Sequence, residues 1–392
     1  TDNEGNSKVV DATVGNSILG TIIPSTELYE DGVSGKLSGE YANIVIDAQS
    51  SVLKNLIFKR GVKLIDELTN VVNNTPRKNT ITIKNLNFDK ILLDGVIGLI
   101  NHADSCVVLD KIQFPDDGIV TIDTEAYIAD KENEECYNLY MNPYGYYTNA
   151  IGVLVGKNEG LIRNSKFVSK ITTTGKAKGS YALGGFVGHN TGKGVVENCS
   201  FKGNVYISED FKDTPKNNLD LQVVFGSFVA INDGDAIVTQ SKLEAGTLSN
   251  YVLTSLGTVY QKSYYDGLPD ADKDPIVATD NIADYQLSSQ IYVVTSNKAV
   301  VGGIVGLLKS GLVNRCSTYK NTNTDNNAII VGDEYRQRIS YAGGIAGIVS
   351  INGQVQDCSN RSNIMTMAIW LFTTNDSNTA NYKIDNAQIA QR

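Results

Sequence analysis

The residue types that most often carry catalysis are scarce in this chain of 392 residues. It contains two histidines, His102 and His189, and 5 cysteines. So few histidines do not assemble into a Ser/His/Asp triad, a Cys/His pair or a zinc site with ordinary ligand spacing. His189 follows a glycine-rich phrase at a predicted corner of the chain. We therefore interpret it as a solvated side chain rather than a catalytic base.

Carboxylates are the other chemistry to consider, because polysaccharide hydrolases place two or three of them about 5 to 10 Å apart. The candidate sets are Asp89, Asp94 and Asp110, and Glu132, Glu134 and Glu135. The outward positions of the repeat described below mix both signs of charge and hold no carboxylate cluster. We expect a noncatalytic protein and keep a polysaccharide hydrolase or lyase as an alternative.

One acidic turn is a candidate metal site. Asp270, Asp272 and Asp274 occupy alternate positions, as acidic ligands do at the start of a calcium loop. The match fails at the sixth position, Pro275, and at the twelfth, Asn281, where such loops carry Gly and Glu. The other interpretation is a solvated acidic turn, so we expect no cofactor and keep calcium at this turn as the alternative.

A tyrosine-rich segment around Pro143 is the candidate binding site. Its rings are those of Tyr137, Tyr140, Tyr144, Tyr146 and Tyr147. Flat aromatic rings stack on sugars and anchor protein contacts at low entropic cost. The alternative is an irregular coil whose tyrosines cover the core.

These candidates must be positioned by a repeat. Gly184-Gly185-Phe186-Val187-Gly188 is followed by Val196-Glu197-Asn198-Cys199-Ser200-Phe201, and the pair returns at Gly302 and Gly343, with looser copies of the glycine phrase at Gly95, Gly152 and Gly226. Such self-similarity indicates one supersecondary unit stacked on itself. The second phrase recurs at 53–58, 83–88, 109–114, 162–167, 196–201, 238–243, 260–265, 313–318 and 355–360.

The positions of the second phrase have distinct physical characters. The first is apolar, the second polar, the fourth small or apolar, and the sixth aromatic or Leu except in the last two copies. The third is often Asn, which tolerates the left-handed conformation of a tight bend. We predict that Phe88, Phe114, Phe167 and Phe201 form one buried stack. We also predict positive φ angles and a ladder of side-chain amides at Asn55, Asn85, Asn164 and Asn198.

A strand, a one-residue bend and another strand, repeated with inward apolar columns, predict an all-β fold. The expected fold is a right-handed parallel β-helix, or solenoid, with about nine or more coils and inserted loops. A propeller is the alternative, but the variable spacing argues against it. We expect an N-terminal segment and cap at 1–45, a solenoid at 46–362 with insertions at about 128–150 and 250–295, and a C-terminal coil or cap at 363–392.

The Gly-Gly-Phe-Val-Gly and Val-Glu-Asn-Cys-Ser pattern resembles the GLUG-motif repeats of bacterial surface adhesins and filamentous haemagglutinin-like proteins, over roughly residues 90–360. This resemblance implies an extracellular or cell-surface adhesion protein and supplies no catalytic residue. The expected partners are surface glycans or proteins of a host or neighbouring cell. We expect their contacts to lie in Glu132–Tyr147 and Leu253–Gln290, because projecting loops usually carry binding.

The alternative function is that of a subunit that assembles end to end into a filament or coat, since a solenoid exposes unpaired strand edges at both ends. The net charge of −9 disfavours nucleic acid, and no apolar run reaches the roughly 18 residues of a membrane span. Cys199, Cys316 and Cys358 share the inward fourth position and are interpreted as small core residues. If any pair forms a disulfide, the candidates are Cys106 with Cys136 and Cys316 with Cys358.

Overall fold

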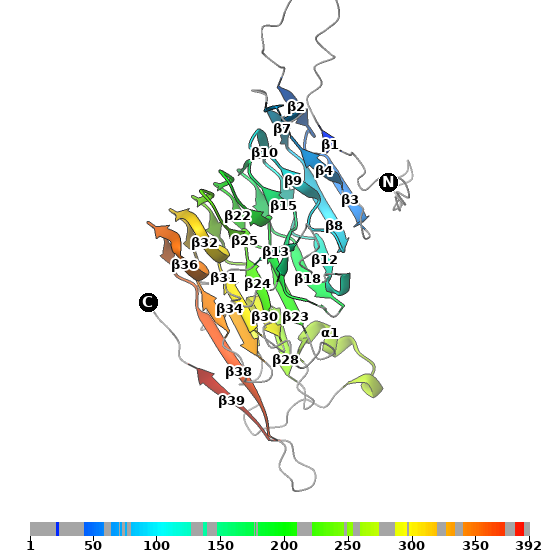
Figure 1. The fold of residues 1–392 in the computed structure, drawn as a ribbon. Coiled ribbons are helices and arrows are strands. Elements are labelled where there is room, and N and C mark those ends of the chain that lie inside the picture. Colours follow the sequence, from blue (N-terminus) through cyan, green and yellow to red (C-terminus); the bar gives the residue numbers. More distant parts are fainter. Residues whose placement is uncertain are drawn as a thin grey trace, which may run out of the picture.

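The chain winds into a rod of stacked β-coils, as the computed structural model shows (Figure 1). It describes residues 21–22, 43–58, 64–69, 71–72, 75–76, 80–126, 136–138, 147–175, 177, 179–209, 222–246, 249–253, 259–273, 287–295, 298–319, 327–333, 340–372 and 381–387. Strands of successive coils pair in parallel. The fold is thus the all-β parallel β-helix that the repeat predicts.

One coil shows how the sequence phrases fold. Its strands are β19 (Tyr181–Gly184), β20 (Val187–Asn190), β21 (Val195–Glu197), β22 (Ser200–Phe201) and β23 (Val205–Glu209). The glycine phrase makes the turn between β19 and β20, where a Cβ on Gly184 would collide with the carbonyl oxygen of Val187. The second phrase makes β21, the bend at Asn198, and β22.

Each strand of this coil belongs to a stack of equivalent strands. β19 stacks with β14 (Tyr147–Gly152), β24 (Gln222–Gly226), β31 (Lys298–Gly302) and β35 (Tyr341–Gly343). The stack of β20 contains β1 (Thr21–Ile22), β4 (Ile65–Leu68), β9 (Ile100–Ala103), β15 (Val155–Asn158) and β25 (Val229–Asn232). The stack of β21 contains β2 (Ile44–Asp47), β7 (Ile81–Lys84), β10 (Val107–Asp110), β16 (Leu161–Arg163) and β26 (Ile237–Thr239). Both of these stacks continue into β32 (Val305–Asn314) and β36 (Ala346–Gln356).

The other two stacks complete the coil. β22 stacks with β11 (Gln113–Phe114), β17 (Lys166–Phe167), β27 (Lys242–Leu243), β33 (Ser317–Thr318) and β37 (Ser359–Asn360). β23 stacks with β12 (Ile119–Asp123), β18 (Lys170–Thr174), β30 (Leu287–Thr295), β34 (Asn327–Asp333) and β38 (Ile364–Phe372). The long strands β3 (Val52–Phe58) and β8 (Asn87–Asp94) begin this side of the rod.

The predicted phenylalanine stack is confirmed. Phe88, Phe114, Phe167 and Phe201 are buried, and the centroids of successive rings lie 5.4, 4.5 and 5.0 Å apart. Phe186 of the glycine phrase packs edge-on against Phe167, with ring centroids 5.7 Å apart. The two sequence phrases therefore recur together because their rings meet across one core.

The predicted bends are confirmed as well. Asn85, Asn164 and Asn198 have φ angles of 57°, 52° and 49°. The Asn198 side chain donates a 2.8 Å hydrogen bond to that of Asn164, as a ladder requires. Where no Asn precedes in the stack, the amide instead donates to an outward carboxylate: Asn164 to Asp110 at 2.8 Å and Asn85 to Asp47 at 2.9 Å.

The copy at 53–58 does not stack as the periodicity predicted. Leu53, not Phe58, pairs beside Phe88, and Phe58 pairs beside Leu93. The strand that precedes β7 in its stack is β2. Asn55 has a φ angle of 53°, but it lies between paired positions that place it opposite Lys90, whose φ angle is 52°. Asn55 and Lys90 thus form a bend of their own in β3 and β8, separate from the bend at Asn85. The sequence around Asn55 resembles the second phrase without occupying its place in the coil.

The copy at 260–265 is not a coil. β29 (Val259–Gln261) pairs antiparallel with β28 (Ser249–Leu253), and α1 (Lys262–Gly267) follows, with a 2.9 Å ion pair between Lys262 and Asp266. Because Leu243 pairs directly with Thr318, the segment that contains this copy is an insertion between neighbouring coils. In Figure 1, α1 projects from the side of the rod.

Other elements decorate the coils. β13 (Cys136–Asn138) adds antiparallel to β14, and β5 (Val71–Val72) pairs with β6 (Thr75–Pro76). Among the described residues, 3-10 turns occur at η2 (Thr124–Ala126) and η3 (Asp270–Asp272). At the last coil, β39 (Asn381–Ala387) pairs antiparallel with β38 and covers its edge.

Candidate functional site

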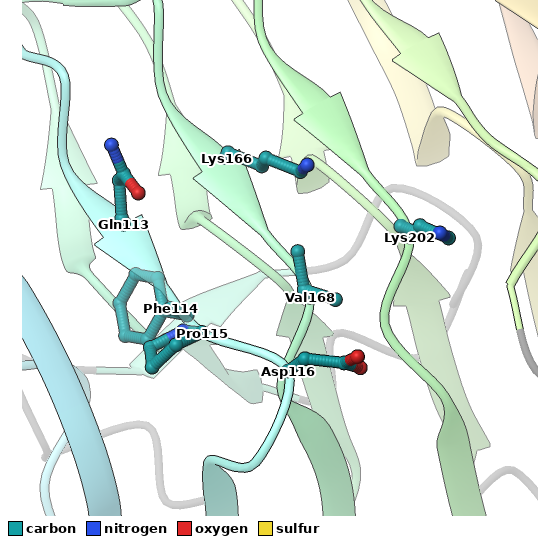
Figure 2. A pocket seen from close by; sticks show the side chains of 7 residues that line it. All are labelled: Gln113, Phe114, Pro115, Asp116, Lys166, Val168 and Lys202. Carbon is teal, nitrogen blue, oxygen red and sulfur yellow. The ribbon is translucent and has the colours of Figure 1, made fainter.

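A depression of about 260 Å³ opens on the outer side of the β22 stack (Figure 2). It is lined by Gln113, Phe114, Pro115, Asp116, Lys166, Val168 and Lys202. Figure 2 shows Val168 between Lys166 and Asp116, with Lys202 on the following coil. Pockets that enclose a drug-sized ligand usually start near 300 Å³, so this open depression suits a single ring of a larger ligand.

The repeat positions these side chains. Gln113, Lys166 and Lys242 occupy the fifth position of the second phrase, which points outward beside the inward Phe. Val168 and Lys202 directly follow the Phe column, and their backbone N–H groups bond to the carbonyls of Phe114 and Phe167. Stacking therefore brings residues more than fifty positions apart onto one narrow surface.

The lysines of this surface are exposed and unpaired. Within the described part of the chain, Lys166, Lys202 and Lys242 make no ion pair and no side-chain hydrogen bond. The nearby acids are Asp116, which lines the depression, and Glu244, which follows Lys202 in its column. We call Lys166, Lys202, Lys242 and the depression beside them the lysine groove. It offers positive charge, the carboxylates of Asp116 and Glu244, and an apolar floor at Val168 and Pro115.

Both histidines lie on a different face, the β20 stack, in a row with Glu67 and Lys157. His102 Nδ1 lies 3.2 Å from Glu67 Oε1, and its Nε2 lies 3.7 Å from Glu159 Oε1. Lys157 also forms an ion pair with Glu159. These contacts describe a surface ion network that ties successive coils together.

The interpretation of His189 as a solvated corner residue is wrong. It is 9% exposed and lies within β20, because the corner follows at Gly192, whose φ angle is 59°. Its Nε2 lies 3.8 Å from Asp233. Asp233 also accepts hydrogen bonds from Lys309 at 2.8 Å and Ser310 at 2.9 Å.

These donors define the charge state of the Asp233 cluster. His189, followed by Lys309, the Gly234 N–H and Ser310, holds the pKa of Asp233 well below its ordinary value, although burial acts in the opposite direction. Ser310 donates to Asp233 and to the Gly234 carbonyl. Its hydroxyl is therefore bonded to the acid rather than arranged as a nucleophile beside an imidazole.

The predicted carboxylate set does not come together. Asp89 is buried in β8, while Asp110 on β10 forms a 3.2 Å ion pair with Arg163. Asp94 instead pairs in register with Asp123 of β12. The set Glu132, Glu134 and Glu135 lies outside the described residues.

The candidate calcium turn is only partly described. Asp270 and Asp272 lie exposed in η3, and Lys273 forms a 3.2 Å ion pair with Asp270. Asp274 lies outside the described residues. Among the residues that the structure places, no three His, Cys, Asp or Glu side chains form a group that could hold a metal ion.

The tyrosine segment is also mostly outside the described residues, which exclude Tyr140, Tyr144 and Tyr146. Tyr137 lies in β13 opposite Thr148, and Tyr147 pairs with Asn138. The structure describes only parts of the two loops that we expect to bind partners. These parts are the β13–β14 pair and the segment of β28, β29 and α1. That expectation stays a prediction.

The inward cysteines stack as the repeat predicts. Cys199 and Cys316 are buried, Cys358 is half-buried, and these three thiols form no disulfide. The Cys316 backbone N–H lies 3.4 Å from the Cys358 sulfur. Hydrogen bonding from Cys316 lowers the pKa of Cys358, whereas the neighbouring Cys358 and burial raise the pKa of Cys316.

Two features were missed at the level of sequence. One is a buried amide ladder, in which Asn158 donates to Asn190 at 2.8 Å and Asn190 to Asn232 at 2.9 Å. Its signal was the recurrence of Asn as the last residue of β15, β20 and β25. The other is the lysine groove, whose signal was Lys at the fifth position of two copies.

The comparisons with known proteins agree with this repeat. Residues 179–206 match the GLUG motif. The chain carries the GLUG motif. The match spans almost the whole coil from β19 to β23, so the motif is one turn of the rod. No curated protein matches the chain. Within the described residues, no helix is long and apolar enough to cross a membrane.

Among solved structures, the chain is similar to one described as "IgA1 Protease", with 14% sequence identity and a TM-score of 0.39. The likeness covers 96% of this chain and 22% of that one. The chain thus spans less than a quarter of the length of the protein it matches.

Proposed function

We propose that this GLUG-motif solenoid is a noncatalytic extracellular or cell-surface protein that binds surface glycans or proteins. The motif supports this proposal, because GLUG repeats resemble those of surface adhesins. The stacked core supports it too, since a continuous column of buried rings makes a stiff support for surface side chains.

The observation that carries the proposal is the lysine groove. Lys166, Lys202 and Lys242 stand exposed and unpaired on one face of a chain whose net charge is −9. Unpaired cations beside a depression make no ion pair that stabilises the fold, whereas they attract an anionic partner. The loops at 132–147 and 253–290 are the second proposed contact surface.

The experiment measures binding and turnover in the same samples. Purified chain is titrated onto immobilised surface glycans and extracellular proteins, and released reducing ends and unsaturated sugars are assayed. We expect saturable binding without product. Product that grows with time would favour the polysaccharide-degrading alternative, and the lack of saturable binding to the whole panel would contradict the proposal.

We also propose end-to-end association as a second candidate function. The first position of the second phrase is buried in the middle of the rod, where Val196 is 0% exposed. In the same column at the rod ends, Ile46 is 40% and Val355 is 41% exposed. On β36, Val349 and Ile351 are 47% and 91% exposed. A second copy that stacks β2 on β36 would continue the column.

A further inference from the structure

We infer that the lysine groove binds a linear acidic polysaccharide whose carboxylates are spaced one per disaccharide, lying along the rod axis. This inference rests on the proposed function and names its ligand. It begins from the positions of the cations. Lys166 pairs in register with Ser200, and Ser200 with Lys242.

The spacing of those rungs sets the spacing of the ligand's charges. Parallel strands lie about 4.8 Å apart, so Lys166 and Lys242 are separated by roughly 9.6 Å along the axis. This is the length scale of a disaccharide repeat in an extended chain. Ser200 between them offers a hydroxyl to the intervening sugar. A polymer that runs across the strands would meet Lys166 and Lys242 two rungs apart in this column, and Lys202, two residues after Ser200, on the rung between them in the adjacent column.

The depression supplies a place for one sugar ring. Val168 and Pro115 form an apolar floor against which the C–H face of a ring packs. Gln113 and Asp116 stand at the edge of that floor and accept or donate hydrogen bonds to hydroxyl groups. Lys166 and Lys202 then lie within reach of a carboxylate on the same ring. The groove therefore combines the three contacts that distinguish an acidic sugar from a simple anion.

The acids of the groove limit the charge density of the ligand. Asp116 lines the same depression as Lys202, and Glu244 follows Lys202 in the outward column. The whole chain is also acidic, with a net charge of −9. A densely sulfated chain or a nucleic acid would bring negative charge against these carboxylates, which is repulsive. A chain with separated carboxylates places its hydroxyl groups there instead.

The test compares four polymers by calorimetry and by surface binding at low and physiological salt. They are hyaluronan oligosaccharides with one carboxylate per disaccharide, polygalacturonate with one per sugar, dextran sulfate, and neutral dextran. We expect hyaluronan oligosaccharides to bind most tightly, and binding to weaken as salt increases. Equal or stronger binding of dextran sulfate, or no acidic polymer binding better than dextran, would overturn the inference.

Variants locate the contact. Lys166→Gln combined with Lys202→Gln should weaken hyaluronan binding about tenfold, because each exposed ion pair contributes up to about 1 kcal/mol. The matched control combines Lys90→Gln with Lys193→Gln, which removes the same charge from exposed sites outside the groove. All four side chains are exposed, so circular dichroism and melting should be unchanged. Equal loss in both double variants would overturn the inference.

The same variants separate this inference from the proposed function. If the groove variant still binds cell surfaces as the unmodified chain does, the ligand assignment fails while the binding function stands. If the unmodified chain itself binds no surface component, the proposed function fails.

Discussion

At the residue scale, a solenoid repeats one environment many times, so the side chains at one position of successive coils have similar surroundings. Ser165, Cys199, Ser241 and Cys316 occupy one inward position, and each sulfur or hydroxyl reaches the carbonyl two residues before it. Small polar and thiol side chains are therefore equivalent there. This explains why cysteines recur in this chain without forming disulfides among the described residues.

Cys358 should be the most reactive of the stacked thiols. It ends the stack, is half-buried, and has its pKa lowered by hydrogen bonding from Cys316. Burial raises the pKa of Cys199 to about 12, so Cys199 should resist alkylation until the chain unfolds. Mass spectrometry after a pulse of iodoacetamide at neutral pH measures both rates.

The control for this prediction is Cys316→Ala, which removes the thiol donor. Its Cys358 should need a higher pH for the same alkylation rate than Cys358 in the unmodified chain. Alkylation of Cys199 as fast as that of Cys358 in the folded protein would contradict the argument.

Asp233 should make stability depend on pH. Its folded-state pKa is depressed, so its stabilising contribution is present above the unfolded value of about 3.9 and is lost as the pH falls below that value. Asp233→Asn should lower the free energy of unfolding by about 1 kcal/mol at neutral pH. Urea titrations should show this difference shrinking in acid.

Asp235→Asn is the control, because Asp235 is an exposed carboxylate two residues away. Its effect on the free energy of unfolding should be small at either pH. A difference between Asp233→Asn and the unmodified chain that is the same at neutral and acid pH would argue against the charge network.

At the element scale, the stacked phenylalanines hold β11, β17 and β22 in register. Phe167 is 0% exposed and contacts rings on both sides, so Phe167→Ala should cost about 3 to 5 kcal/mol of unfolding free energy. Phe167→Leu should cost less, because Leu243 fills the same position two coils further along the stack. Chemical denaturation of the three proteins gives the comparison, and equal losses would show that the site collapses around either change.

Much of the coil could be predicted from sequence, because the same pattern recurs in several copies of the repeat. The apolar positions, the bend at Asn164 and the Phe stack follow from patterns that agree across copies. The prediction was wrong for two single copies, at 53–58 and 260–265, whose sequences match the second phrase but do not form the same part of a coil. Asn55 makes a real bend, but pairing of β3 with β8 displaces it to another part of the coil. Tyr260 lies in a strand that pairs antiparallel with a neighbour.

The candidate site was harder to predict than the fold. The sequence drew attention to Asp270 and Tyr137 because acids and aromatic rings cluster there along the chain. The lysine groove is built from Lys166, Lys202 and Lys242, which are neighbours only after coils of unequal length have been stacked. Long insertions between coils hide such columns, because they change the sequence spacing but not the spacing of the rungs.

At the scale of the whole molecule, the two sides of the last coil differ in how their strand edges are covered. β39 covers β38 on one side of the last coil, whereas β36 pairs on one edge with β32, and no described strand pairs with its other edge. Its exposed Val349, Ile351 and Val355 stand where an added rung would cover them. Unpaired strand edges of this kind promote association.

Stacking of β2 of one copy on β36 of the next is a head-to-tail contact, which does not close on itself and gives rods that lengthen with concentration. Sedimentation velocity and electron microscopy of the purified chain should detect such rods. Ile351→Lys combined with Val355→Lys should keep the chain monomeric, because two charges would then face the added rung. Ile119→Lys, at a side chain that is 44% exposed on the wall of the rod, is the control and should associate as the unmodified chain does. If the unmodified chain stays monomeric at every concentration, or if the β36 variant lengthens equally, the ends do not assemble, and binding along the wall of the rod remains as its function.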